Sequence, residues 1–262
     1  MIIFVVRLAT LALLLLSSLA SGAVEIAESL NVGDTVSGAI KIGRRIVVLP
    51  AGDWQLSVKS ERSSSTEGNV QAPTIMALFF QEIRDGRLNR MLELTATKNS
   101  GRVNWIDEPC KSKGDSYWME DRKRGINDQF CLRIGFRAGI VDNARGEAFQ
   151  AWARDIKAKS IGYSPEMPFV SVTRYTSYDY LQMTVSFDPS VSGIASSQNP
   201  NRQSNDWNGL KSVPNSTHAK FYDALVLWAP KFAEAVQRAF AGDEKLSDAD
   251  FGAPVLPSLS KP

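Results

Sequence analysis

The sequence predicts an α+β fold: a mostly antiparallel β-sheet built from hairpins, with helices on one face. Two observations support this class. Apolar and polar residues alternate through much of the N-terminal half, and apolar residues recur at helical spacing in two later segments. A period of two marks strands with one buried face, and a period near 3.6 marks amphipathic helices. Since no repeat of fixed period is found, a single domain is expected over residues 24–241.

The first predicted strands lie in residues 35–42 and 54–58, where apolar and polar side chains alternate. Between them, the apolar run 44–50 ends in the turn residues Pro50–Asp53. A turn rich in Pro and Gly between two such runs is typical of a hairpin, so the runs on either side are expected to pair. Later alternating segments add strands at 131–136, 169–175 and 180–187.

The clearest local signal is Asp85-Gly86, between alternating segments at 74–84 and 87–97. Asp-Gly favours a two-residue hairpin turn because both positions tolerate positive φ. If the register set by this turn continues along both strands, one face of the hairpin is apolar. The opposite face is mainly polar and is expected to be only partly covered by another element. The expected pairs are Arg84–Arg87, Ile83–Leu88 and Phe79–Leu92, with Phe80–Met91 on the opposite face.

An amphipathic helix is predicted near 144–159. Trp152 and Ile156 fall on its apolar stripe, and Asp142 or Asn143 is the expected N-cap.

A second, C-terminal helix is predicted near 217–241. Pro230 is expected to kink or split it, and Gly242 is a suitable stop. The Ser/Asn-rich segment 188–216 before it is expected to be a long loop that is functional or mobile. The tail, 242–262, is expected to be disordered.

Residues 1–23 have the pattern of a signal peptide. Arg7 precedes an apolar run at 8–16, and small residues lead to a cleavage position after Ala23, with Gly22 as the alternative. The run is shorter than the roughly 20 residues of a spanning helix. The mature chain is therefore expected to be secreted or periplasmic, with no membrane span after cleavage; a retained N-terminal anchor is the alternative.

Charge and motifs exclude several function classes. With 30 basic and 28 acidic residues, the chain offers no electrostatic case for nucleic acid. The one histidine, His218, cannot form a multi-histidine metal site. Residues 204–209 resemble part of a calcium loop, but Ser204 and Asn215 stand at its first and last ligand positions, where acidic ligands are needed. No cofactor or metal is expected.

The chain has two cysteines, Cys110 and Cys131. In an oxidising compartment, two cysteines without a CxxC spacing predict a disulfide rather than a redox pair. The bond would staple the charged segment 110–131, which has little apolar area with which to order itself.

Four aromatic residues are candidates for ligand binding: Trp118 and Tyr117 inside the cysteine segment, and Tyr175 and Tyr178 near a strand turn. Exposed aromatics with polar neighbours suit ligand or protein recognition. The alternative is packing across strands, where aromatics are also favoured.

These observations predict an exported, soluble, non-catalytic binding or accessory module of unknown ligand. The alternative is an exported hydrolase that uses paired carboxylates, because the 28 acidic residues leave many pairings open. A third hypothesis, part of a larger assembly, rests on the partly covered Phe80–Met91 face.

Overall fold

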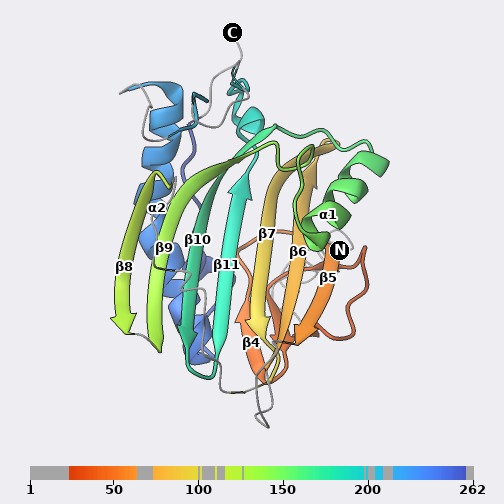
Figure 1. The fold of residues 1–262 in the computed structure, drawn as a ribbon, viewed down its shortest axis with the longest axis vertical. Helices are drawn as coiled ribbons and strands as arrows, with labels where there is room; N and C mark the ends of the chain where they lie inside the picture. The colour runs from red at the N-terminus through yellow and green to blue at the C-terminus, as the bar shows by residue number, and fades with distance from the viewer. Residues whose placement is uncertain are drawn as a thin grey trace, which may run out of the picture.

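The computed structural model describes residues 24–63, 73–99, 101, 110, 116–125, 127–197, 199, 204–208 and 215–257. These residues form one large antiparallel sheet with a helix against each face, which confirms the α+β class (Figure 1). The strands run in the order β2 (Thr35–Val36), β5 (Trp54–Ser63), β6 (Thr74–Arg84), β7 (Arg87–Thr97), β11 (Tyr180–Phe187), β10 (Glu166–Thr176), β9 (Asp128–Ala138) and β8 (Trp118–Gly125).

A small second sheet contains β1 (Glu25–Ile26), β3 (Ala39–Ile42) and β4 (Arg45–Val48). The predicted single strand at 35–42 is wrong, because the chain turns at Gly38 (φ 76°) and its two halves join different sheets. The hairpin expected across Pro50–Asp53 is also wrong: β4 pairs with β3, and β5 pairs with β2 and β6. The connection instead carries the chain from one sheet to the other.

The Asp85-Gly86 hairpin forms as predicted at its turn, where both residues have positive φ. Arg84 pairs with Arg87 and Ile83 with Leu88, but Glu82 then pairs with Arg90. Asn89 is therefore an extra residue on β7, a β-bulge that shifts every later pair by one. Phe79 pairs with Glu93 and Phe80 with Leu92, so the predicted pairs Phe79–Leu92 and Phe80–Met91 are wrong.

The two helices lie on opposite faces of the sheet, not on one face as expected (Figure 1). Helix α2 (Thr217–Ala241) packs against β9, β10 and β4, and α1 (Glu147–Ala158) packs near β5. Both faces of the β6–β7 hairpin carry large apolar side chains and need a cover. Phe80 lies in the core under α2, whereas Phe79 and Met91 lie in the core under α1.

Helix ends differ in detail from the sequence expectations. Helix α1 begins after Gly146, and neither Asp142 nor Asn143 is its N-cap. Helix α2 begins at a Ser216 cap, runs through Pro230 without being split, and ends at Gly242 (φ 75°). Neither α1 nor α2, the helices of the described residues, has the length and apolar character to cross a membrane.

The loop 188–216, expected to be functional or mobile, and the tail, expected to be disordered, both contribute residues to the core. Within the 188–216 loop, a short 3-10 helix, η1 (Pro189–Ser192), forms, and Trp207 is fully buried. In the tail, a second 3-10 helix, η2 (Asp248–Phe251), buries Phe251, so disorder is the wrong prediction for its described residues 242–257. The tail is short of apolar residues, but Phe251 and Leu246 are enough to dock it.

Candidate functional site

A cavity of about 600 Å³ opens where the small sheet, the end of α2 and one end of the large sheet meet. This volume lies within the range of small-molecule sites, roughly 300–1,000 Å³. Its walls come from four parts of the chain that are distant in sequence: Val24, Ala39, Ile42, Arg44–Ile46 and Val48; Thr97–Asn99; Asp179; and Phe240–Glu244 with Leu246.

The polar centre of this cavity is an ion pair between Arg45 and Asp179. Arg45 projects from the first residue of β4, and Asp179 lies in the turn between β10 and β11, so the pair ties the small sheet to the large one. The Arg45 side chain is only 12% exposed. Thr97 donates its hydroxyl hydrogen to the second oxygen of Asp179. Both carboxylate oxygens are therefore engaged, and the pair is a fixed feature of the wall.

Phe240, near the end of α2, places its ring against the Arg45 guanidinium, which lies 4.4 Å from the ring centroid. Cation–π contact of this kind favours the charged guanidinium. Burial lowers the pKa of Arg45, and the charge of Asp179 and its hydrogen bond act in the opposite direction. Arginine nevertheless remains protonated in proteins, so Arg45 presents a fixed cation.

The other charges of the wall are also largely neutralised. Lys98 pairs with Glu61 at 3.2 Å, and Asp243 accepts from Arg238 at 2.7 Å. Arg44 and Glu244 make no ion pair within the part of the chain that the structure describes, and they contribute one charge of each sign. The wall is thus balanced in charge.

The remaining wall is apolar. Ile42, Val48 and Leu246 are buried, while Ile46 is exposed at 44% on the rim. Val24, the residue after the predicted cleavage position, also lines the cavity. Ala23 and the rest of the expected signal peptide lie outside the described residues. A balanced polar centre within apolar walls suits a ligand that is partly apolar and carries no net charge.

The four aromatic candidates do not converge on a common site. Tyr175 is fully buried, and Tyr178 is 57% exposed in the β10–β11 turn. Tyr117 stacks on Tyr222 of α2 with ring centroids 4.4 Å apart, and Trp118 packs beside the core under α2. Packing against neighbouring residues explains the positions of Tyr175, Tyr117 and Trp118.

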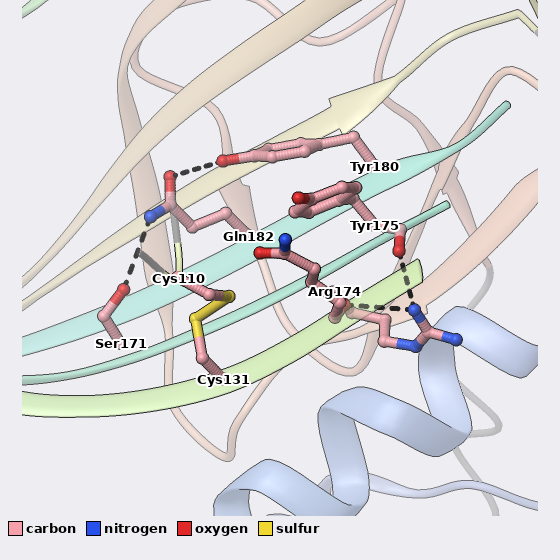
Figure 2. Close-up of a disulfide and its surroundings, with 8 residues drawn as sticks. Cys110, Cys131, Ser171, Arg174, Tyr175, Tyr180 and Gln182 are labelled. Carbon is pink, nitrogen blue, oxygen red and sulfur yellow. Dashed lines mark hydrogen bonds between the residues drawn. A yellow bond between two sulfur atoms is a disulfide. The ribbon is translucent and has the colours of Figure 1, made fainter. Parts of the chain in front are cut away.

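The predicted disulfide between Cys110 and Cys131 is present, with a Cα–Cα distance of 5.6 Å. Figure 2 shows it beside Ser171, Tyr175 and Gln182. The segment that it closes is not simply a charged loop, because residues 118–125 form β8 and pair with β9. The bond therefore joins the chain before β8 to the neighbouring strand.

Two carboxylates do meet in the described residues, but not in the manner of a hydrolase. Asp243 and Asp250 both bind Arg238, at 2.7 and 2.8 Å. Hydrogen bonds from Arg238 lower the pKa of Asp243, and backbone and arginine hydrogen bonds lower the pKa of Asp250 to about 2. A glycosidase-type acid needs a raised pKa. Both carboxylates are ionised at neutral pH and bind the same guanidinium, that of Arg238. Neither can therefore act as a proton donor.

No group of three or more His, Cys, Asp or Glu side chains comes together in the described ranges. The calcium-like segment at 204–208 instead positions Trp207, whose backbone carbonyl accepts from the Tyr222 hydroxyl at 2.6 Å. His218 packs edge-on against Trp207, with ring centroids 4.5 Å apart.

The residues that build the cavity were missed by sequence reasoning. Arg45 and Asp179 are 134 positions apart, and neither lies in a recognisable motif. The sequence offered one weak indication of this site: Asp179 follows Tyr178, a candidate binding residue, in the turn between two predicted strands. Comparison with protein-family models, with curated proteins and with solved structures found no match to this chain.

Proposed function

We propose that this protein is an exported, non-catalytic binding module that holds a small ligand in the cavity around Arg45 and Asp179. The ligand is partly apolar and either uncharged or zwitterionic. The observation that carries the proposal is the cavity itself, whose central ion pair is internally neutralised and whose other walls are mainly apolar. Such a site binds by burial and shape, with a few polar groups that fix orientation.

Export is proposed from the N-terminal sequence pattern and is supported by the Cys110–Cys131 bond, because disulfides persist in oxidising compartments. A binding role is favoured over hydrolysis because the carboxylates at Arg238 have lowered pKa values. In the cavity, Asp179 is committed to Arg45 and Thr97, so it is not free to act as a base.

A neutral fluorescent probe tests the proposal. N-phenyl-1-naphthylamine should bind with one-site saturation and a blue-shifted emission, while an anionic naphthalene sulfonate should bind at least tenfold more weakly. Ala241→Trp fills the cavity from an exposed position at the end of α2 and should remove binding. Ala249→Trp, at an exposed position of η2 outside the cavity lining, is the matched control and should bind normally.

Two results would overturn the proposal. One is equal binding of the probe by the wild type and Ala241→Trp, which would place the probe elsewhere. The other is no saturable binding of the neutral probe by a folded wild-type protein.

A further inference from the structure

On the face of the large sheet opposite α2 lies a half-buried arginine, Arg133, for which the described residues provide no partner. Arg133, in β9, makes no ion pair or hydrogen bond within the described residues, and its Nε is sealed from solvent without an acceptor. A partly desolvated charge is costly unless it is paired. An apolar or neutral side chain of similar length would cover this strand without that cost, so the charge itself calls for an explanation.

The nearest charged neighbours increase the imbalance. Arg137 follows Arg133 by four positions on the same strand and face, and the pKa of Arg133 is lowered first by burial and then by this like charge. Glu93, one acid on this face, is bound by both terminal nitrogens of Arg137. Asp121 of β8 lies on the same face, opposite Cys131. Arg137 is also held close to Phe149 and Phe169, with its guanidinium 5.1 and 5.2 Å from the ring centroids. Glu93 is thus committed to Arg137, and Arg133 has no ion pair within the described residues.

Polar side chains continue from Arg133 across the sheet. Strand register places Arg133 beside Ser171 and Ser171 beside Thr184. The two hydroxyl oxygens are 2.7 Å apart, and Gln182 donates to Ser171 at 3.5 Å. Figure 2 shows Ser171 and Gln182 on this face, near the disulfide. Because one hydroxyl hydrogen joins the two oxygens, the second hydrogen is left for another acceptor. Both side chains are buried, with exposures of 5% for Ser171 and 2% for Thr184.

We propose that Arg133 and the adjacent Ser171–Thr184 hydroxyls form a binding site for an oxyanion, either a carboxylate, a sulfate or a phosphate. A guanidinium offers several N–H donors in one plane, which suits two oxygens of such a group. This site lies on another part of the sheet from the cavity at Arg45 and does not depend on it.

A second cavity, of about 500 Å³, is bounded by Arg137, Ile140, Phe149 and Arg145 among others, and its lining contains no acid. Arg145 is exposed and makes no ion pair within the described ranges, so it adds positive charge at the rim. The lining of this cavity includes neither Arg133 nor Ser171, so it is separate from the proposed oxyanion site.

Binding of inorganic phosphate and sulfate, measured by calorimetry and by melting temperature at constant ionic strength, tests this site. Both ions should bind saturably and raise the melting temperature above its value in chloride. Arg133→Met should weaken phosphate binding at least tenfold, while its melting temperature in chloride is unchanged or higher because a desolvated charge is removed. Arg44→Met, which removes an unpaired arginine from the other cavity, should bind phosphate like the wild type.

A second variant keeps the test decisive. If Arg133→Met does not fold, Ser171→Ala should still weaken phosphate binding several-fold. The proposal is overturned if phosphate and sulfate act like chloride, or if the folded Arg133→Met or Ser171→Ala variant binds phosphate as well as the wild type.

Discussion

Leu88 and Leu92 lie on opposite faces of the large sheet, although they are four residues apart on one strand. Residues separated by an even number normally share a face. The bulge at Asn89 inserts one residue between them and reverses the alternation. Leu88 therefore packs under α1 and Leu92 under α2, and the sheet becomes apolar on both sides.

The same bulge gathers a charged cluster around Glu82. Its carboxylate, 7% exposed, accepts from Arg90 at 2.6 Å and from Arg84 at 2.7 Å, and Asn89 donates to it as well. Burial raises the pKa of Glu82, but these hydrogen bonds and charges outweigh it and hold the pKa below the usual value. The cluster therefore stabilises the fold above the ordinary glutamate pKa, and this stabilisation is lost as the pH falls below it.

Glu82→Gln should lower the free energy of unfolding at pH 7 by roughly 2–3 kcal/mol, because it leaves Arg90 partly buried without its counter-charge. Urea unfolding between pH 7 and pH 3 measures this, and the wild-type and variant curves should converge in acid. Glu61→Gln is the control: its pair with Lys98 is more exposed, so a change of at most about 0.5 kcal/mol is expected. A constant difference from pH 7 to pH 3 would contradict the electrostatic explanation.

The disulfide should stabilise the fold without being required for β8. Replacing Cys110 and Cys131 by alanine should cost about 3 kcal/mol, mainly through the entropy of the unfolded chain. Pairing of β8 with β9, from Trp118–Ile134 to Gly125–Asp128, does not use the bond. Hydrogen exchange should therefore still protect the β8–β9 amides in the double variant and in the reduced wild type. Loss of that protection would show that the bond holds the strand in place.

His218 should make stability depend on pH near neutrality. Burial against Trp207 lowers the pKa of His218, and the charges of Asp206 and Glu166 oppose this only in part. Its Nε2 is buried and has no hydrogen-bond partner among the residues that the structure describes, and the N-terminal end of α2 disfavours a cation. The folded state therefore binds the proton less readily than the unfolded state. The neutral His218 therefore makes its full contribution to the free energy of unfolding above the ordinary histidine pKa. This contribution declines as the pH falls below that pKa.

The variant His218→Gln should remove this decline. Chemical unfolding measured from pH 7.5 to pH 5 should give a smaller slope for the variant than for the wild type. Equal slopes would assign the dependence to other groups.

Local signals in the sequence predicted the features that depend on neighbouring residues. The turn at Asp85-Gly86 and the C-terminal stop at Gly242 need only their own backbone conformations, and both formed where expected. The bulge at Asn89 has no such signature, because an extra residue in a strand is defined only by its partner strand. The missed residue there placed Leu92, Leu94 and Ala96 on the opposite face from Leu88.

The candidate site was less predictable for a related reason. Arg45, Asp179 and Phe240 come from three separate regions, and each is ordinary in its local context. Only the folding of the small sheet onto the end of α2 brings them together. The aromatic candidates were conspicuous in the sequence, but Tyr175 and Tyr117 owe their positions to packing.

The tail after α2 provides the sharpest contrast between composition and structure. Phe251 is fully buried against Phe232, and its carbonyl accepts from the Trp228 indole at 2.8 Å. Phe251→Ala should therefore lower the free energy of unfolding by about 3–5 kcal/mol, as for other buried aromatic truncations. Val255, which is 90% exposed in the same tail, provides the control, and Val255→Ala should change stability by less than about 0.5 kcal/mol. Urea unfolding at pH 7 compares the two variants directly. Equal, small effects would mean that the tail is loose in solution, as its composition suggests; a large effect confined to Phe251 requires the tail to dock on α2.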